Sequence, residues 1–293
     1  MKTNKSKRDS RQHHRSTVFD LLSCGLTRIG LNLLCVLLFS LVVTAPVAAN
    51  EDLMKLGGEA YERGDYAAAV RIFAEASVRL TAELGERHPS TLRSGNNLAK
   101  SLIDTGRPDE ALPLIQRVVA LRTEVLGPRS PDTMESIDLL AWALCHSGRL
   151  AECTTQSERL LALRMEVQGE DHKETLDAMN NLALAYYLAG RFSEQIELGE
   201  KALQKQIVLL GERQIVTIDT MSTLAWGYWS MGRFGEHLRL AERVLQLCSE
   251  LFGESNPRSM RALDSLANGY SSLGRFEDSL ALQKRALERL MAI

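Results

Sequence analysis

The chain has 293 residues, with 35 Lys and Arg, 37 Asp and Glu, and five cysteines. Residues 1–49 hold seven of the basic and two of the acidic residues, so residues 50–293 carry 28 basic and 35 acidic side chains. This acidic balance argues against a nucleic-acid partner. The three cysteines left after residue 49 are too few, and odd in number, for a disulfide framework.

Residues 1–49 have the order of a secretory signal. Their basic residues precede or border an uncharged apolar stretch at residues 29–43, and small residues follow, with Val47 and Ala49 two positions apart. We therefore expect a signal peptide at residues 1–49 and a mature chain that begins at Asn50. The alternative is an uncleaved membrane anchor, because residues 29–49 are just long enough to span a bilayer. Either interpretation predicts an exported protein, in the periplasm or cell envelope if the source is bacterial.

From residue 53 onward, glycine recurs with a stride of 42 residues in two parallel series. One series is Gly64, Gly106, Gly148, Gly190, Gly232 and Gly274, and the other is Gly85, Gly127, Gly169, Gly211 and Gly253. A fixed period of this length indicates an array of identical structural units, each of which buries its apolar face against its neighbours. Residues 50–293 are therefore expected to form one repeat domain.

Each unit is predicted to be a pair of helices. In residues 92–126, one apolar helical stripe ends at Gly106, Pro108 can begin the next helix, and a second stripe ends at Gly127. Ser130 before Pro131 has the pattern of a helix cap followed by a first-turn proline. Among the equivalent positions, His88 is expected to cap less well and Gln214 not at all.

Columns of equivalent residues define the packing of these helices. A leucine column is followed directly by an alanine column and, three residues later, by leucine or tyrosine; an arginine follows each glycine that ends a first helix. The columns are Leu98, Leu140, Leu182, Leu224, Leu266; Ala99, Ala141, Ala183, Ala225, Ala267; Leu102, Leu144, Tyr186, Tyr228, Tyr270; and Arg107, Arg149, Arg191, Arg233, Arg275. Small residues beside large ones are what close helix packing requires.

These columns, with Gly-Arg-Phe at Gly190–Phe192, resemble the tetratricopeptide repeat. The 42-residue period and the segment from Leu84 to Leu92 are similar to the kinesin light chain variety of that repeat. The resemblance implies an all-α, right-handed solenoid of antiparallel helix pairs with about six repeats. It implies a protein or peptide partner, without naming one, because this module serves many unrelated partners.

One column departs from the family pattern, which prefers alanine early in the second helix. Its members are Ala69, Ala111, Cys153, Gln195, His237 and Ser279. We expect looser packing at the later positions. Cys153 also lies eight residues from Cys145, so the two either pair after export or remain small buried apolar side chains.

In tetratricopeptide arrays the first helix of each pair lines an inner groove, so residues offset from the core columns predict the groove surface. The predicted groove residues are Asn96, Lys100, Asp138, Trp142, Asn180, Leu184, Tyr187, Ser222, Trp226, Trp229, Asp264 and Asn268. All three tryptophans of the chain fall on this surface, and exposed aromatic clusters are typical anchors of interfaces. The alternative is that tight curvature buries the aromatic residues against one another as core.

No motif for catalysis, a cofactor or a metal appears in the sequence. No pair among the six histidines has metal-ligand spacing, and no phosphate-binding loop, nucleophile elbow or dinucleotide fingerprint is present. We therefore expect a non-catalytic scaffold that binds a protein or peptide in an aromatic groove.

Two other functions remain open. The apolar residues Leu280, Leu287, Leu290 and Ile293 near the chain end predict a face for self-association as a homodimer, or for docking another protein. The third hypothesis is a regulatory subunit of a separately encoded enzyme. Membrane contact is expected only through residues 29–49, if they are not removed.

Overall fold

The computed structural model describes residues 50–291, so the predicted signal peptide or anchor at residues 1–49 lies outside the described residues. Residues 50–62 are helical, and eleven helices follow them. These are α2 (Tyr66–Leu84), α3 (Pro89–Asp104), α4 (Pro108–Leu126), α5 (Pro131–His146), α6 (Leu150–Gln168), α7 (Lys173–Leu188), α8 (Phe192–Leu209), α9 (Ile215–Ser230), α10 (Phe234–Phe252), α11 (Pro257–Ser272) and α12 (Phe276–Met291). The predicted all-α array of six helix pairs is confirmed. None of the described helices is long and apolar enough to cross a membrane.

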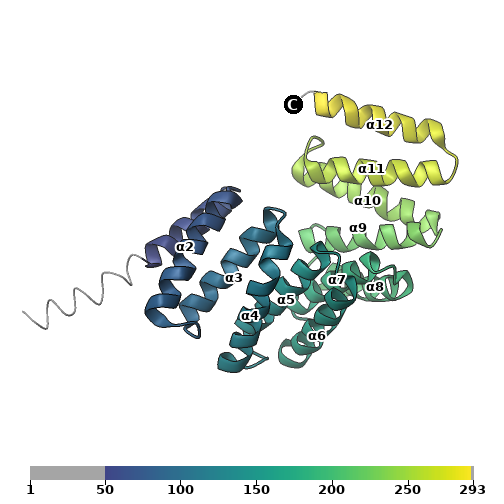
Figure 1. The fold of residues 1–293 in the computed structure, drawn as a ribbon. Helices are drawn as coiled ribbons and strands as arrows, with labels where there is room; N and C mark the ends of the chain where they lie inside the picture. The colour runs from purple at the N-terminus through teal and green to yellow at the C-terminus, as the bar shows by residue number, and fades with distance from the viewer. Residues whose placement is uncertain (1–49, 292–293) are drawn as a thin grey trace, which may run out of the picture.

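The pairs succeed one another along a curved path from α2 to α12 (Figure 1). Each helix packs against the next, and the first helices of neighbouring pairs also touch: α3 with α5, α5 with α7, α7 with α9, and α9 with α11. Second helices of neighbouring pairs make no comparable contact. The first helices therefore line the inner side of the curve, and the second helices form its outer side.

The periodic glycines end the helices as the sequence predicts. Gly106 has φ of +75° and Gly127 has φ of +85°, a left-handed conformation that side chains with a Cβ rarely adopt. The amide of Gly106 donates to the carbonyl of Ile103, and that of Arg107 donates to the carbonyl of Leu102. These bonds satisfy carbonyl groups that the end of α3 would otherwise leave unpaired.

The helix starts differ from the expectation. His88 caps α3, because its ring Nδ1 accepts the amide of Ser90 at 3.2 Å, and His172 caps α7 by accepting from Glu174 at 3.3 Å. Ser130 makes no side-chain bond to the start of α5. At this position of the repeat, His88 and His172 thus cap their helices and Ser130 does not, in contrast to the usual preference for serine. Gln214 makes no capping bond, as expected.

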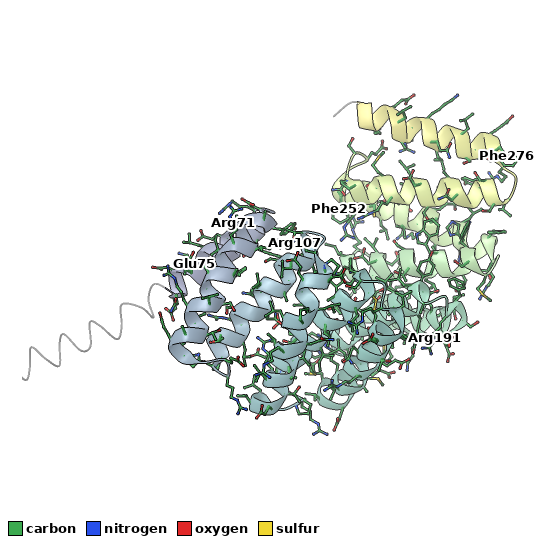
Figure 2. The ribbon with its side chains drawn as sticks, viewed as in Figure 1. Arg71, Glu75, Arg107, Arg191, Phe252 and Phe276 are labelled. Carbon is green, nitrogen blue, oxygen red and sulfur yellow. A yellow bond between two sulfur atoms is a disulfide. The ribbon has the colours of Figure 1, made fainter. Side chains whose placement is uncertain are left out.

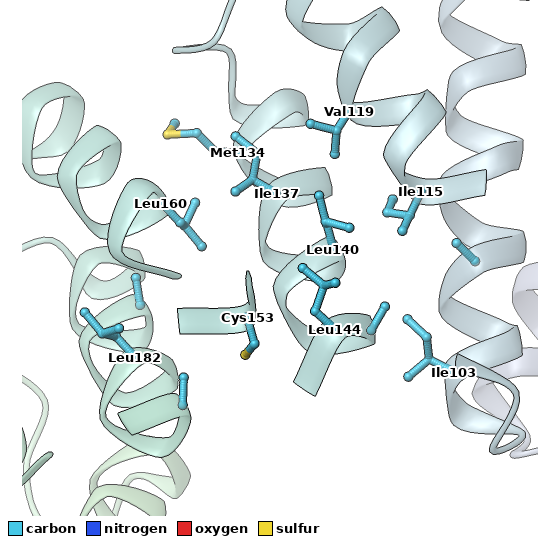
Figure 3. Close-up of a cluster of buried hydrophobic side chains, with 14 of the residues drawn as sticks. Ile103, Ile115, Val119, Met134, Ile137, Leu140, Leu144, Cys153, Leu160 and Leu182 are labelled. Atoms are coloured by element: carbon cyan, nitrogen blue, oxygen red, sulfur yellow. The ribbon is translucent and has the colours of Figure 1, made fainter. Parts of the chain in front are cut away.

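The leucine and alanine columns form the core. Ala99 is fully buried, Leu140 and Leu182 are nearly so, and Leu98 is half-buried at the N-terminal side of the main cluster. This cluster runs through α3 to α8 and includes Ile115 from the second helix of its pair (Figure 3). Burial of this apolar surface along the whole array supplies the main driving force for folding.

The predicted loose packing in the second helices is wrong. Gln195 and His237 are both fully buried, because the facing first helix of the next pair carries glycine where earlier pairs carry a residue with a Cβ. The facing column is Ser101, Ala143, Ala185, Gly227 and Gly269. A Cβ at Gly269 would lie 2.6 Å from the His237 ring. The larger side chains thus fill space that the glycines leave.

The tyrosine and arginine columns form a repeated contact on the first helices. Tyr228 donates its hydroxyl to Glu200 on the preceding second helix at 2.5 Å, and the Arg233 guanidinium lies 4.4 Å from the centre of the tyrosine ring. The same arrangement recurs one pair earlier and one pair later. In the earlier pair, Tyr186 contacts Glu158 and Arg191. In the later pair, Tyr270 contacts Glu242 and Arg275. Arg191 is labelled in Figure 2. In each set the hydrogen bond links two neighbouring pairs, and the cation–π contact lies within one pair, between the tyrosine and the arginine that follows its helix.

Cys145 and Cys153 form a disulfide between the end of α5 and the start of α6. Their Cα atoms lie 5.3 Å apart, within the range that a disulfide requires. Three units later, the equivalent positions carry Ser271 and Ser279, whose hydroxyl oxygens are hydrogen-bonded at 2.8 Å. Cys248 is buried and unpaired among the described residues.

Candidate partner-binding groove

The inner surface of α3, α5 and α7 contains a pocket of about 380 Å³, here called the first pocket. It is lined by the predicted groove residues Asn96, Lys100, Asp138, Trp142 and Leu184. They meet because each lies on a first helix, at positions that repeat every 42 residues. The disulfide Cys145–Cys153 and the apolar side chain of Leu139 complete part of the wall.

A second pocket of about 550 Å³ lies further along the array, between α7, α9 and α11. The predicted residues Asn180, Ser222 and Trp226 line it, and so do Trp142 and Leu184. These two side chains, together with Asn181, line both pockets and therefore form the partition between them. The structure thus brings eight of the twelve predicted groove residues to one continuous inner surface.

The tryptophans are not buried against one another as core. Trp142 is 42% exposed and Trp229 is 37% exposed, while Trp226 is half-buried. The Trp226 and Trp229 rings meet edge to face with their centres 5.8 Å apart, and Trp142 packs on the ring of His146 at 4.1 Å. This exposure is high for tryptophan, and it leaves aromatic faces available along the inner side.

The other four predicted residues line neither pocket. Tyr187 is half-buried against Phe192, with ring centres 5.7 Å apart. Trp229 donates its indole N–H to the Ser272 hydroxyl at 2.8 Å. Asp264 and Asn268 are exposed on α11. Tyr187 and Trp229 lie near the C-terminal ends of α7 and α9. Asp264 and Asn268 lie on α11, the first helix of the last pair.

Three of the polar groove residues, Asn96, Asp138 and Asn180, also hold the first helices together. Asn96 is buried and accepts from Ser136 at 2.8 Å, Asp138 accepts from Asn181 at 3.2 Å, and the side-chain oxygen of Asn180 accepts from the Thr220 hydroxyl at 3.0 Å. Each bond joins neighbouring first helices. These groups therefore have a structural role beside any contact with a partner.

Sequence reasoning missed a third, charged cleft of about 790 Å³ that shares lining residues with both pockets. It shares Asp138 with the first pocket and Asn180 with the second. Its remaining carboxylates are Asp132, Glu135, Glu174, Asp177 and Asp219, against the basic residues Arg164 and Lys173. A signal was present, because Glu135, Asp177 and Asp219 lie one helical turn before groove positions that were predicted.

Burial shapes the ionisation of this cleft. Loss of water raises the pKa of Asp138 above its ordinary value of 3.8, although the charge of Arg164 and the bond from Asn181 oppose the shift. Burial likewise raises the pKa of Asp177, which also lies near Lys173 and Arg164. Burial therefore disfavours the ionised form of both carboxylates, and a further positive charge nearby would favour it.

The cleft contains no metal site. Within residues 50–291, no three side chains of the metal-binding types gather closely enough to hold an ion. Cys145 and His146, adjacent in sequence, are separately engaged: Cys145 in the disulfide and the His146 ring with the carbonyl of Trp142 at 2.9 Å. The inner surface therefore consists of aromatic, amide and carboxylate groups suited to binding.

Comparison with known proteins places the chain in a family. Two family models, both described as tetratricopeptide repeat, match residues 53–90 and 91–132, and residues 140–206 and 219–292. The chain belongs to the tetratricopeptide repeat family. Tetratricopeptide repeat proteins typically bind other proteins, and the family is in general non-catalytic. No curated protein matches the chain.

Solved structures agree with the kinesin light chain variety of tetratricopeptide repeat. One solved structure, from Podosopora anserina, consists of TPR-like repeats that are named for kinesin light chain and are nearly identical to one another. Its sequence is 26% identical to this chain, with a TM-score of 0.60 over 69% of this chain and 96% of that one. BtubC (BKLC) from P. vanneervenii is 21% identical, with a TM-score of 0.63 over 77% and 89%. A Rap protein in complex with Competence and Sporulation Factor is 11% identical, with a TM-score of 0.55 over 80% and 73%. The last two share the fold alone.

The predicted C-terminal face is partly described. Leu280 is 50% exposed and Leu287 is 57% exposed on α12, and Phe276, at the start of that helix, is 70% exposed (Figure 2). The side chain of Leu290 and residue Ile293 lie outside the described residues.

Proposed function

We propose that this tetratricopeptide repeat protein is an exported scaffold that binds an extended segment of a protein partner along α5, α7 and α9. The observation that carries the proposal is the position of Trp142 and Leu184 between two pockets on the inner surface. A bound segment that crosses this partition places apolar side chains on both of its sides. Aromatic anchors next to pockets are where interfaces concentrate their binding energy.

The fold supports such binding. A Rap protein with the same fold has been solved in complex with Competence and Sporulation Factor. In the present chain, the bonds between Asn96 and Ser136, and between Asn180 and Thr220, hold the first helices in place. A surface that is already rigid loses less entropy when a partner binds.

The disulfide supports the export part of the proposal. Cys145–Cys153 joins two helices of one pair, and such bonds form and persist in oxidising compartments such as the periplasm or the secretory pathway. This agrees with the signal-like order of residues 1–49, whose cleavage is part of the proposal. Mass spectrometry of the protein from its native host tests it directly, since cleavage after Ala49 leaves Asn50 as the first residue.

Capture of partners tests the groove. The protein from residue 50 onward, which contains every described helix, is immobilised and exposed to the envelope fraction of the native host. A variant with Trp142→Ala, Trp226→Ala and Trp229→Ala is tested in parallel, after circular dichroism has shown native helix content. We expect a partner that the parent retains and the variant loses.

A matched control removes apolar surface from the outer side. Val78 is 72% exposed and Val208 is 79% exposed, both on second helices. The Val78→Ala, Val208→Ala variant should keep the partner. If the tryptophan variant retains every partner of the parent, binding does not use the groove and the proposal is wrong.

A second function is favoured by the exposure of Leu280 and Leu287 on α12. Two copies of α12 that pair through this face would bury apolar surface that is now in contact with water. Sedimentation equilibrium of the protein from residue 50 onward should then show a mass that rises with concentration. A Leu280→Lys, Leu287→Lys variant should remain monomeric, and a parent that stays monomeric at high micromolar concentration rules this function out.

A further inference from the structure

The first pocket combines a carboxylate with apolar walls. Asp138 lies on the pocket wall formed by α5, and the side chains of Leu139, Trp142 and Leu184 and the disulfide also line the pocket. The volume of about 380 Å³ is ample for one long side chain. An aliphatic chain that entered along Trp142 and Leu184 would carry its end group toward the carboxylate.

The charges on this pocket are not balanced by the protein itself. Lys100 is the one basic residue on the pocket wall, and its ammonium group lies over the ring of Tyr61, 4.6 Å from the ring centre. Glu135 has a partner of its own, because the buried Arg122 approaches it at 3.4 Å. Asp138 accepts a hydrogen bond from the neutral amide of Asn181, which brings no charge. A bound cation would therefore meet a carboxylate without a direct ion pair.

The neighbouring cleft has the same sign. Asp132, Glu174 and Asp177 continue from Asp138 along the first turns of α5 and α7. Burial raises the pKa of Asp138, and the nearby Glu135 adds to the shift, while Arg164 and the bond from Asn181 oppose it. A cation in the first pocket would favour the ionised form. It would also lie against the face of an exposed tryptophan, where cations are attracted.

We propose that the partner anchors itself by inserting a lysine or arginine side chain into the first pocket, with its stem between Trp142 and Leu184 and its charge against Asp138. This inference rests on the proposed groove and names the class of segment that it accepts. The second pocket makes the contrast, because its wall carries Arg258 and Arg261 against one carboxylate, Asp219, which is already paired with Arg258. The bound segment is thus cationic where it crosses α5 and α7, and not where it approaches α11.

The test uses small probes that imitate one side chain. The protein from residue 50 onward is labelled with ¹⁵N, and the three indole N–H signals are assigned by single Trp→Phe variants. It is titrated with n-butylguanidinium, n-butanol and butyrate, which carry short unbranched alkyl chains and differ in charge. We expect the guanidinium to shift the Trp142 signal to saturation and to bind about tenfold more tightly than the alcohol.

Variants locate the charge. Asp138→Asn should weaken guanidinium binding about tenfold, because it removes the carboxylate and keeps the shape. Asp264→Asn, an exposed groove carboxylate outside both pockets, should leave it unchanged. The inference is overturned if n-butanol or butyrate binds as well as the guanidinium, or if no probe gives a saturable shift at Trp142.

The two proposals fail separately. If partner capture depends on the tryptophans but the guanidinium probe shows no preference for the first pocket, the cationic anchor is wrong and the groove remains. If partner capture does not depend on the tryptophans, the groove itself is wrong, whatever the probes show.

Discussion

Gln195 occupies the space where a side chain on residue 227 would stand. Its side-chain oxygen lies 1.7 Å from the position that a Cβ on Gly227 would take, and its amide nitrogen donates to the Thr223 carbonyl at 3.1 Å. One turn of α9 thus carries both the carbonyl that accepts from the buried amide nitrogen and the gap that holds the side chain, whose oxygen has no hydrogen-bond partner among the described residues. This contact combines packing with one hydrogen bond, made by the amide nitrogen, in one side chain.

Gly227→Ala should therefore destabilise the protein by about 2 kcal/mol, because the added methyl group collides with Gln195. Gly235→Ala is the matched control: it lies in α10 with open space around it and should cost nothing. Urea unfolding followed by circular dichroism measures both changes.

The collision can be relieved from the other side. Gly227→Ala combined with Gln195→Ala recreates the alanine pair that the array has at Ala111 and Ala143. The two substitutions should be less destabilising together than the sum of their separate costs. Simple additivity in the double-mutant cycle would show that the two residues do not share the space that we describe.

Loss of the disulfide should lower stability moderately. Cys145 and Cys153 are eight residues apart, and closing so short a loop is worth about 2 kcal/mol. Replacing both by serine should reproduce the hydroxyl pair of Ser271 and Ser279 and limit the loss. Thermal melts with and without reductant measure the effect. A parent that melts at the same temperature in both conditions would contradict a stabilising bond.

The reverse exchange should introduce a bond. Ser271→Cys with Ser279→Cys places two thiols where hydroxyl oxygens now lie 2.8 Å apart, at positions equivalent to the natural disulfide. We expect a second disulfide to form on mild oxidation. Peptide mapping under non-reducing conditions identifies the pair, and either single variant serves as the control. Thiols that stay free after oxidation would show that the last pair is not equivalent in geometry to the third.

The bond from Tyr228 to Glu200 should be visible in alkaline solution. Burial, then the hydrogen bond to Glu200, raises the pKa of Tyr228 from 10.0 to about 12. A group with a raised pKa in the folded state stabilises the fold fully below pH 10, and this stability is lost as pH rises toward 12. Tyr228→Phe should cost about 1 kcal/mol at pH 7 and reduce the loss between pH 10 and 12.

Absorbance of tyrosinate as a function of pH follows this group directly. The difference between the parent and Tyr228→Phe should be a step well above pH 10. A step at pH 10 would mean that the hydroxyl does not bind Glu200 in solution. Glu200→Gln keeps an acceptor without its charge and should lower the pKa of Tyr228 part of the way.

The repeat pattern predicted the fold because its requirements are local. Gly106 must adopt positive φ to end a helix, and Ala99 must be small where two backbones meet, so both recur at every unit. Contacts between units were less accessible to sequence reasoning. Whether Gln195 is accommodated depends on Gly227, 32 residues further along the chain.

The groove was predicted in part for the same reason. A helical offset places Trp142 and Trp226 on the inner side, and they line the pockets there. The bonds of Asn96 and Asn180 to neighbouring first helices depend on the separation of α3, α5, α7 and α9, which no single repeat contains. The acidic cleft was missed because its carboxylates come from several units and their net effect appears only once they share a surface.

The exchange of small and large residues between facing helices also constrains how an array like this one can change in length. Excision of α9 and α10 would place Gln195 opposite Gly269, where space is already available. Excision of α7 and α8 would instead place Cys153 opposite Gly227 and leave an empty volume in the core. Gain or loss of whole repeats is thus tolerated at some boundaries and penalised at others, and the order of the units is part of what the sequence encodes.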